Sequence, residues 1–106
     1  MSDEKVMPKD TDRLVVALCA DYFRRKRLIE RRTATYTVIM ECRYLNYRIF
    51  DAAASIVDIE TAELFIREIG EETGYAKSAV INMSESVYKL RKKEVKRAIA
   101  KRLSLF

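Results

Sequence analysis

The side chains that carry out most protein chemistry are scarce in this chain of 106 residues. It contains no histidine and only two cysteines, Cys19 and Cys42. Without histidine, a catalytic triad, a histidine-activated thiol and the usual zinc sites each lack a member. Two lone thiols in such a chain are typical of reduced core residues rather than of a disulfide framework. We therefore expect no enzyme activity, no metal and no cofactor.

Basic side chains are the chemistry that the chain does offer, and they are unevenly distributed. The net charge is +5. Residues 75–106 carry nine basic and two acidic groups, whereas residues 49–74 carry one basic and seven acidic groups. Residues 13–48 are basic again, with nine basic and three acidic groups. A field as asymmetric as this can orient a polyanion against one surface, so the charge pattern favours a polyanionic partner.

The basic C-terminal segment has the periodicity of an amphipathic helix that begins after Ser84, a good N-cap residue. Its apolar residues share one face, and its cations share the opposite one. The apolar face consists of Val87, Tyr88, Val95, Ala98 and Ile99. The basic face consists of Lys89, Lys92, Lys93, Lys96 and Arg97. Such a helix closes a helical core, presents cations to phosphates or lies on a membrane surface, and the lack of tryptophan disfavours the membrane.

Residues 66–85 have the spacing of two short helices joined by a tight turn. Two glycines carry this prediction. Gly70 lets the second helix, predicted over 76–83, approach the first one closely, and Gly74 takes the left-handed conformation that ends the first helix. The apolar positions expected to pack the two helices together are Ile69, Tyr75, Val80 and Met83.

The segment EETGYAKSAV within these residues resembles the turn and recognition sequence of the helix-turn-helix in bacterial transcription regulators. The resemblance implies that the helix over 76–83 enters the major groove of DNA and reads bases with its early residues. Lys77 would reach a phosphate or a guanine edge, and Asn82 would pair with adenine. Carried over by position, the early residues are Ala76, Lys77, Ser78, Ile81 and Asn82.

The segment after Ser84 resembles another DNA-reading region, found at the C-terminus of phage ArpU- or RinA-like regulators and in sigma-factor region 4. In those families a serine-capped helix with a Tyr-x-Leu-Lys-like run contacts DNA, and the run here is Tyr88-Lys89-Leu90-Arg91. The chain is short for those families and lacks the proline and acidic cluster typical of sigma linkers. This placement makes the helix over 76–83 the positioning helix. Glu85, Ser86, Lys89 and Lys93 would then approach the DNA. The DNA contacts that we predict on this helix are Ser86, Lys89, Arg91, Lys92, Lys93 and Lys96.

The elements that must position these residues are all predicted to be helical. With two glycines and one proline, the chain has few turn points, which favours long helices. Apolar residues recur at three- and four-residue steps along most of its length. We predict one small all-α bundle of about five helices that contains a helix-turn-helix. Its parts are a loose tail over 1–10, a first helix over about 11–31, an apolar helix over 36–57, and a DNA-reading half over 58–103 that Asp58 caps at its start.

These features together predict a small cytoplasmic transcription regulator that binds double-stranded DNA and takes no small-molecule substrate. The apolar helix over 36–57 fits a core element and a homodimer contact equally well. Two alternatives stay open: a helical protein–protein adaptor that uses this helix, and an RNA-binding protein that uses the basic face. The first apolar stretch, from Leu14 to Cys19, is too short for a membrane span or a secretory signal.

Overall fold

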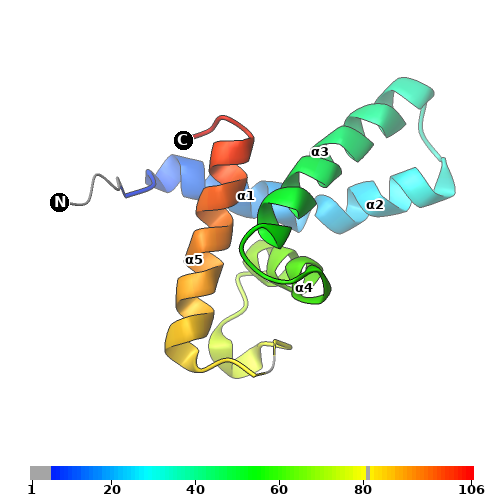
Figure 1. Ribbon diagram of the computed structural model, residues 1–106. Coiled ribbons are helices and arrows are strands. Elements are labelled where there is room, and N and C mark those ends of the chain that lie inside the picture. The colour runs from blue at the N-terminus through cyan, green and yellow to red at the C-terminus, as the bar shows by residue number, and fades with distance from the viewer. Residues whose placement is uncertain (1–5, 81) are drawn as a thin grey trace.

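The computed structural model describes residues 6–80 and 82–106, and this part of the chain contains helices and no strand. The predicted all-α class is therefore confirmed. No helix within these described residues is long and apolar enough to cross a lipid bilayer. The elements are α1 (Lys9–Ala20), α2 (Tyr22–Arg31), α3 (Tyr36–Ala54), α4 (Ile59–Gly70), the 3-10 turn η1 (Tyr75–Lys77) and α5 (Glu85–Arg102) (Figure 1).

Helix α4 lies at the centre of the hydrophobic core because its apolar residues recur along one face. It begins at the predicted cap, where the Asp58 carboxylate accepts a hydrogen bond from the Thr61 amide at 2.8 Å. Its buried apolar residues are Ala62, Phe65, Ile66 and Ile69. Helices α1, α3 and α5 pack around it and contribute Val15, Cys19, Ile49, Ala53, Val95 and Ile99 to the same core.

The helix predicted over about 11–31 is divided at Asp21 into α1 and α2. The buried guanidinium of Arg25, in α2, connects the two helices at this bend. It donates hydrogen bonds to the Leu18 carbonyl (2.6 Å), to Asn46 Oδ1 (2.6 Å) and to the Asp21 carboxylate (3.1 Å). A guanidinium is buried only where such acceptors surround it. The bend lets α1 pack on α4 and α5 while α2 packs along α3.

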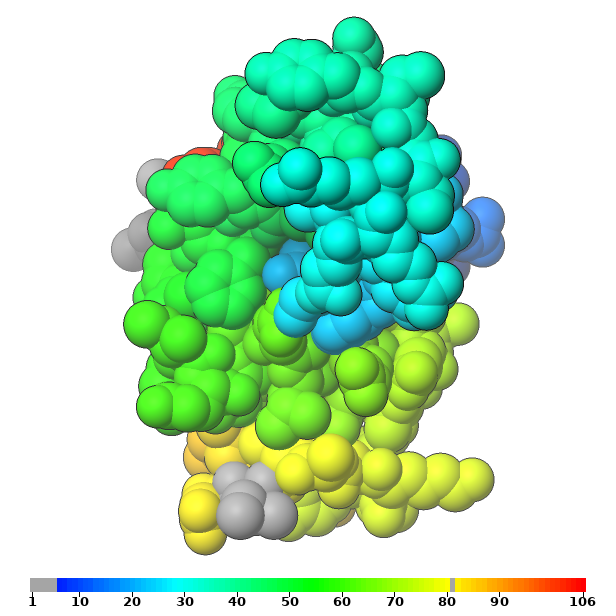
Figure 2. Space-filling model, turned by 90° about the vertical axis from the view of Figure 1, so that its right-hand side faces the viewer, coloured from blue at the N-terminus to red at the C-terminus, as the bar shows by residue number. Residues whose placement is uncertain are grey.

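The end of α2, the connection after it and the beginning of α3 project from the core as a two-helix arm, which we define as residues 26–41 (Figure 1). No residue of the arm is buried. In the space-filling view the arm forms the upper end of the molecule, and the segment between α4 and α5 forms the lower end (Figure 2). The helix predicted over 36–57 is therefore buried only from Cys42 onward, and Ile49 and Ala53 are among the residues that it adds to the core.

The described residues of the helix predicted over 76–83 do not form it, so the helix-turn-helix is not confirmed in that placement. Only the 3-10 turn η1 lies there, and the backbone becomes extended at Ser78. Two side chains bind the amides that a helix would need. The Glu68 carboxylate accepts a hydrogen bond from the Ala79 amide (2.7 Å), and Ser78 Oγ accepts one from the Val80 amide (2.9 Å). Because this helix is absent and the first one is divided, the prediction of about five helices is not confirmed.

Candidate nucleic-acid interface

Helix α5 presents its cations to solvent because its apolar residues fix its rotation against the core. As predicted, Ser84 caps the helix, and its hydroxyl accepts a hydrogen bond from the Val87 amide at 3.3 Å. The last turn carries Lys101 and Arg102, where cations interact favourably with the helix dipole. The residues that face the core are Tyr88, Val95, Ile99 and Ala100, which are all buried.

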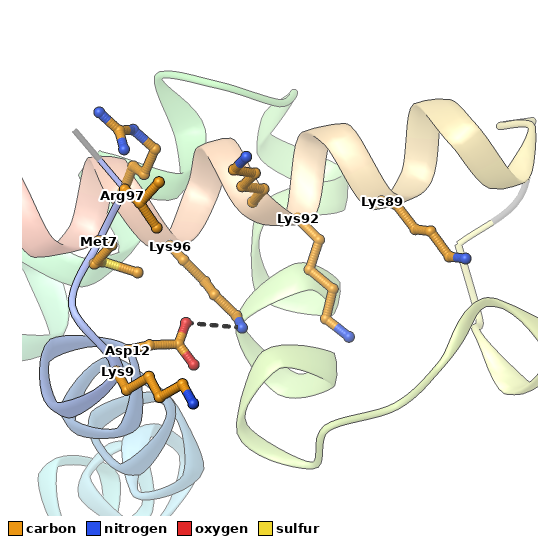
Figure 3. A pocket seen from close by; sticks show the side chains of 9 residues that line it. Met7, Lys9, Asp12, Lys89, Lys92, Lys96 and Arg97 are labelled. Carbon is orange, nitrogen blue, oxygen red and sulfur yellow. Dashed lines mark hydrogen bonds and ion pairs between the residues drawn. The ribbon is translucent and has the colours of Figure 1, made fainter. Parts of the chain in front are cut away.

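A groove of about 340 Å³ runs between α5 and the beginning of α1 (Figure 3). Lys89, Lys92 and Lys96 extend from α5 on the same side of that helix. Six cationic side chains and one carboxylate line the groove, beside two apolar residues of the N-terminal segment. The lining residues are Val6, Met7, Lys9, Asp12, Lys89, Lys92, Lys93, Lys96 and Arg97. Among the described residues the cations that line the groove outnumber its one carboxylate, so this part of the surface is electropositive.

The groove lysines differ in how firmly the protein itself holds them. Lys96 pairs with Asp12 at 3.1 Å, and the more exposed Lys89 pairs with Glu85 at 2.8 Å. Lys92 donates a hydrogen bond to the Thr73 carbonyl. Burial, aided by the charge of Lys96, lowers the pKa of Lys92 below its ordinary value.

Lys93 and Lys9 have no acceptor within the described residues and are exposed. Exposed ion pairs such as Lys89–Glu85 contribute little stability, so a phosphate can replace the carboxylate at small cost. The groove therefore offers two unpaired cations and one weakly paired cation to an anionic ligand.

A buried carboxylate, Glu68 on α4, connects the core to the segment that precedes α5. Its side chain is only 4% exposed. It accepts hydrogen bonds from the hydroxyls of Ser78 and Tyr88 (2.6 Å each) and from the Ala79 amide (2.7 Å). Burial alone would raise the pKa of Glu68, but these donors outweigh it and hold the pKa below its ordinary value. Burial and this carboxylate together raise the pKa of Tyr88 to about 12.

Gly70 permits a close helix approach, as predicted, but its partner is α1 and not a second helix of the motif. A Cβ atom at Gly70 would lie 2.6 Å from the Ala20 Cα atom, inside any permitted contact distance. Any side chain there would force α1 and α4 apart. The prediction assigned this glycine the correct role and the wrong neighbour.

Gly74 does not take the left-handed conformation that was predicted for it, because its φ is −85°. Glu72 takes that conformation instead, with φ 54°. The Thr73 amide then donates to the Glu68 carbonyl (2.9 Å), and the Glu72 amide donates to the Ile69 carbonyl (3.2 Å). This pattern is a Schellman motif, which ends α4 without using the glycine.

The apolar motif positions are partly where they were expected. Ile69 and Val80 are buried and Met83 packs against the core, although neither Val80 nor Met83 lies in a helix. The predicted burial of Tyr75 is wrong, because more than a third of it is exposed. Its hydroxyl donates a hydrogen bond to the Met83 carbonyl (2.9 Å), and this bond draws the side chain across the surface of the segment.

Of the predicted DNA contacts, the structure brings together the groove residues Lys89, Lys92, Lys93 and Lys96. Lys77 and Asn82 are exposed in the segment between α4 and α5, where Asn82 has a φ of 66°. Ser78 is bound to Glu68, and Ile81 lies outside the described residues.

The two other predicted contacts on α5 do not line the groove either. Arg91 pairs with Glu94 at 2.6 Å, and Ser86 is exposed beside Ser84 at the start of α5. The predicted contacts at 77, 78, 82, 86 and 91 therefore lie outside the groove.

Sequence reasoning missed the contribution of the N-terminal segment. Residues 1–10 were expected to form a loose tail, but α1 begins at Lys9 and Met7 packs against the core, while residues 1–5 lie outside the description. Lys9 and Asp12 line the groove although they are more than 70 residues from α5. No local pattern predicts this, since the contact arises from the packing of α1 against α5.

The two cysteines are buried and unbridged, as expected. Burial raises the pKa of Cys19 to about 12, so its thiolate is scarce at neutral pH. Within residues 6–80 and 82–106, no three thiol or carboxylate groups lie close enough together to hold a metal ion.

No protein-family model matches this chain, and no curated protein or solved structure is significantly similar to it.

Proposed function

We propose that the protein binds double-stranded DNA through the basic face of α5, and that it does so as a small transcription regulator. The observation that carries the proposal is the groove in which, among the described residues, the lysines Lys9, Lys89, Lys92, Lys93 and Lys96 outnumber the one carboxylate, Asp12. Clustered, accessible cations bind phosphates and release the counterions condensed on them. Binding of this kind needs no catalytic group.

The shape of α5 supports duplex DNA as the ligand. The major groove of DNA is about 12 Å wide and accepts an α-helix. The first half of α5 presents Ser86, Lys89, Leu90 and Lys93 to solvent, while Tyr88 holds it to the core. A helix fixed by one face and exposed on the other can enter the groove, with flanking lysines on the phosphates.

The proposal includes a modified form of the predicted helix-turn-helix, in which α4 and α5 are the two helices. Helix α4 would support α5 from behind, and the segment between them, held by Glu68, would replace the predicted tight turn. Of the two resemblances, this arrangement favours the one in which the serine-capped helix contacts DNA. Lys77 would then reach a flanking phosphate.

Fluorescence anisotropy with labelled duplex DNA at several salt concentrations tests the proposal. Binding should weaken steeply with salt, and Lys93→Ala should reduce the slope of log affinity against log salt by about 1. Lys101→Ala is the matched control, because it removes the same exposed side chain from the same helix outside the groove.

Three outcomes would contradict the proposal. The first is an absence of binding at low salt. The second is an equal effect of Lys93→Ala and Lys101→Ala, which would indicate binding by net charge alone. The third is tighter binding to structured RNA than to duplex DNA, which would favour the RNA alternative.

A further inference from the structure

Helix α3 carries an exposed apolar stripe that no other helix of the described residues covers. Only the Arg48 guanidinium of the same helix lies over it, 5.3 Å from the centre of the Tyr44 ring. Tyr36, Met40, Tyr44 and Tyr47 follow one another at steps of three and four residues, so they share one face of the helix. The tyrosines are 78%, 65% and 62% exposed, and Met40 is 42% exposed. Single exposed apolar residues are common on protein surfaces, but an aligned row of aromatic ones marks an interaction surface.

The stripe begins on the arm, which also lacks a core of its own. None of residues 26–41 is buried, although Leu28, Ile29 and Ile39 lie half-buried in the seam between the two helices. Short helices are marginal in water unless an apolar face is packed against another layer. One face of the arm therefore lacks the packing partner that would bury its apolar residues, and a further helix could supply it.

We propose that a second copy of this chain covers the stripe, with the two α3 helices packed antiparallel about a two-fold axis. A two-fold interface requires a patch that is complementary to itself. Antiparallel pairing about the middle of the stripe sets Tyr36 against Tyr47 of the second copy and Met40 against Tyr44 of the second copy. Both are favourable contacts, aromatic on aromatic and thioether on aromatic ring.

The pairing also gives each arm the layer that it lacks. Two helical hairpins packed face to face form a four-helix arrangement, in which each hairpin completes the core of the other. A different protein would have to supply a complementary stripe of its own, whereas a second copy already carries one.

The size of the stripe fits a reversible dimer. Each aromatic side chain can bury roughly 150–250 Å², so the three tyrosines at their present exposure offer roughly 300–500 Å². A stable interface buries about 800 Å² on each partner. The polar residues beside the stripe, such as Thr37 and Arg43, would supply the remainder as a rim. We therefore infer an equilibrium between monomer and dimer.

The inference is independent of the proposed function. The arm and the start of α5 lie at opposite ends of the molecule, so a dimer through α3 leaves the basic groove open (Figures 1 and 2). Salt should also affect the two associations in opposite directions. It screens the repulsion between two chains of charge +5 and favours the dimer, whereas it weakens binding to phosphates.

Sedimentation velocity over a wide range of protein concentrations tests the inference in the absence of any nucleic acid. The wild type should pass from monomer to dimer as its concentration rises. Tyr44→Lys and Tyr47→Lys should each weaken self-association by about tenfold or more. Ile59→Lys is the matched control, since Ile59 is equally exposed at the start of α4 and lies outside the stripe. Circular dichroism checks that each variant keeps its helix content.

A wild type that stays monomeric throughout the range would overturn the inference. So would a dimer that Ile59→Lys disrupts and the tyrosine variants leave intact. If a tyrosine variant loses helix content, the thermal midpoint of the wild type decides instead. It should rise with protein concentration if the folded state is dimeric, and a constant midpoint would contradict the dimer.

Discussion

At the scale of single residues, Glu68 decides the shape of the segment between α4 and α5. A buried carboxylate is tolerated only where hydrogen bonds replace its hydration, and Glu68 has three donors from two different segments. The same bonds that satisfy the carboxylate remove the amide of Ala79 from helix formation and hold Tyr88 of α5 against the core. One side chain thus determines both a loop and the position of a helix.

Removing the charge of Glu68 should destabilise the fold. We expect Glu68→Gln to lower the free energy of unfolding by about 2 kcal/mol, because hydrogen bonds to charged groups are stronger than those to amides. Urea denaturation followed by circular dichroism measures the change. Glu60→Gln, at an exposed position in the first turn of the same helix, should change stability far less.

The pH dependence of stability provides a second readout for Glu68. Its pKa is lowered in the folded state relative to an ordinary value of 4.5, so its contribution is complete above that pH. The contribution is lost as the pH falls from 4.5 through the folded pKa. The wild type should therefore lose more stability than Glu68→Gln between neutral and acidic pH. Equal losses would contradict the role assigned to this carboxylate.

At the scale of elements, the contact between α1 and α4 depends on the absence of one side chain. Backbone atoms of Cys19 and Ala20 lie so close to Gly70 that a methyl group cannot fit between the helices. This contact fixes where α1 crosses α4, and the course of α1 in turn carries Lys9 and Asp12 to α5.

The two glycines of the chain should respond differently to substitution. We expect Gly70→Ala to destabilise the protein by about 1–3 kcal/mol, since overpacking a close helix contact displaces backbone. Gly74→Ala should be neutral or slightly stabilising, because nothing lies within 4 Å of the added carbon and the backbone there suits any residue. Thermal or urea unfolding of the pair compares them directly, and a reversed order would refute the packing argument.

The helices were largely predictable from the sequence, because apolar periodicity and capping residues act locally. Asp58 and Ser84 cap α4 and α5 as predicted. The bend at Asp21 and the loss of the helix over 76–83 were not predictable. Both depend on buried polar side chains, Arg25 and Glu68, whose partners come from other elements. Local periodicity contains no information about such partners.

At the scale of the whole molecule, the same limit applies to the candidate site. Four of its lysines follow from the helical wheel of α5, and the groove that they line does not. Its other wall comes from the opposite end of the chain, where Lys9 and Asp12 had no distinguishing signal. The sequence can predict which cations share a helix face. Which residues lie on the other side of the groove depends on how helices far apart in the sequence pack together.

The packing around α1 also predicts how Cys19 reacts. It is buried at the junction of α1 and α4 and its pKa is raised to about 12, so a thiol reagent should reach it only when the fold opens. In a Cys42→Ser variant, the labelling rate should be far below that of the urea-unfolded chain. It should rise with urea at the slope of global unfolding. Rapid labelling of the native protein would show that this junction opens locally.

The ion pair between Asp12 and Lys96 joins residues 84 positions apart and has a consequence for synthesis on the ribosome. Because α5 supplies both the groove lysines and the core residues Tyr88, Val95 and Ile99, neither the groove nor the core is complete until α5 has left the exit tunnel. A nascent or prematurely terminated chain therefore has no assembled anion site. Fragments that lack α5 would not compete with the full chain for an anionic ligand. Because their core is incomplete, proteases would degrade them.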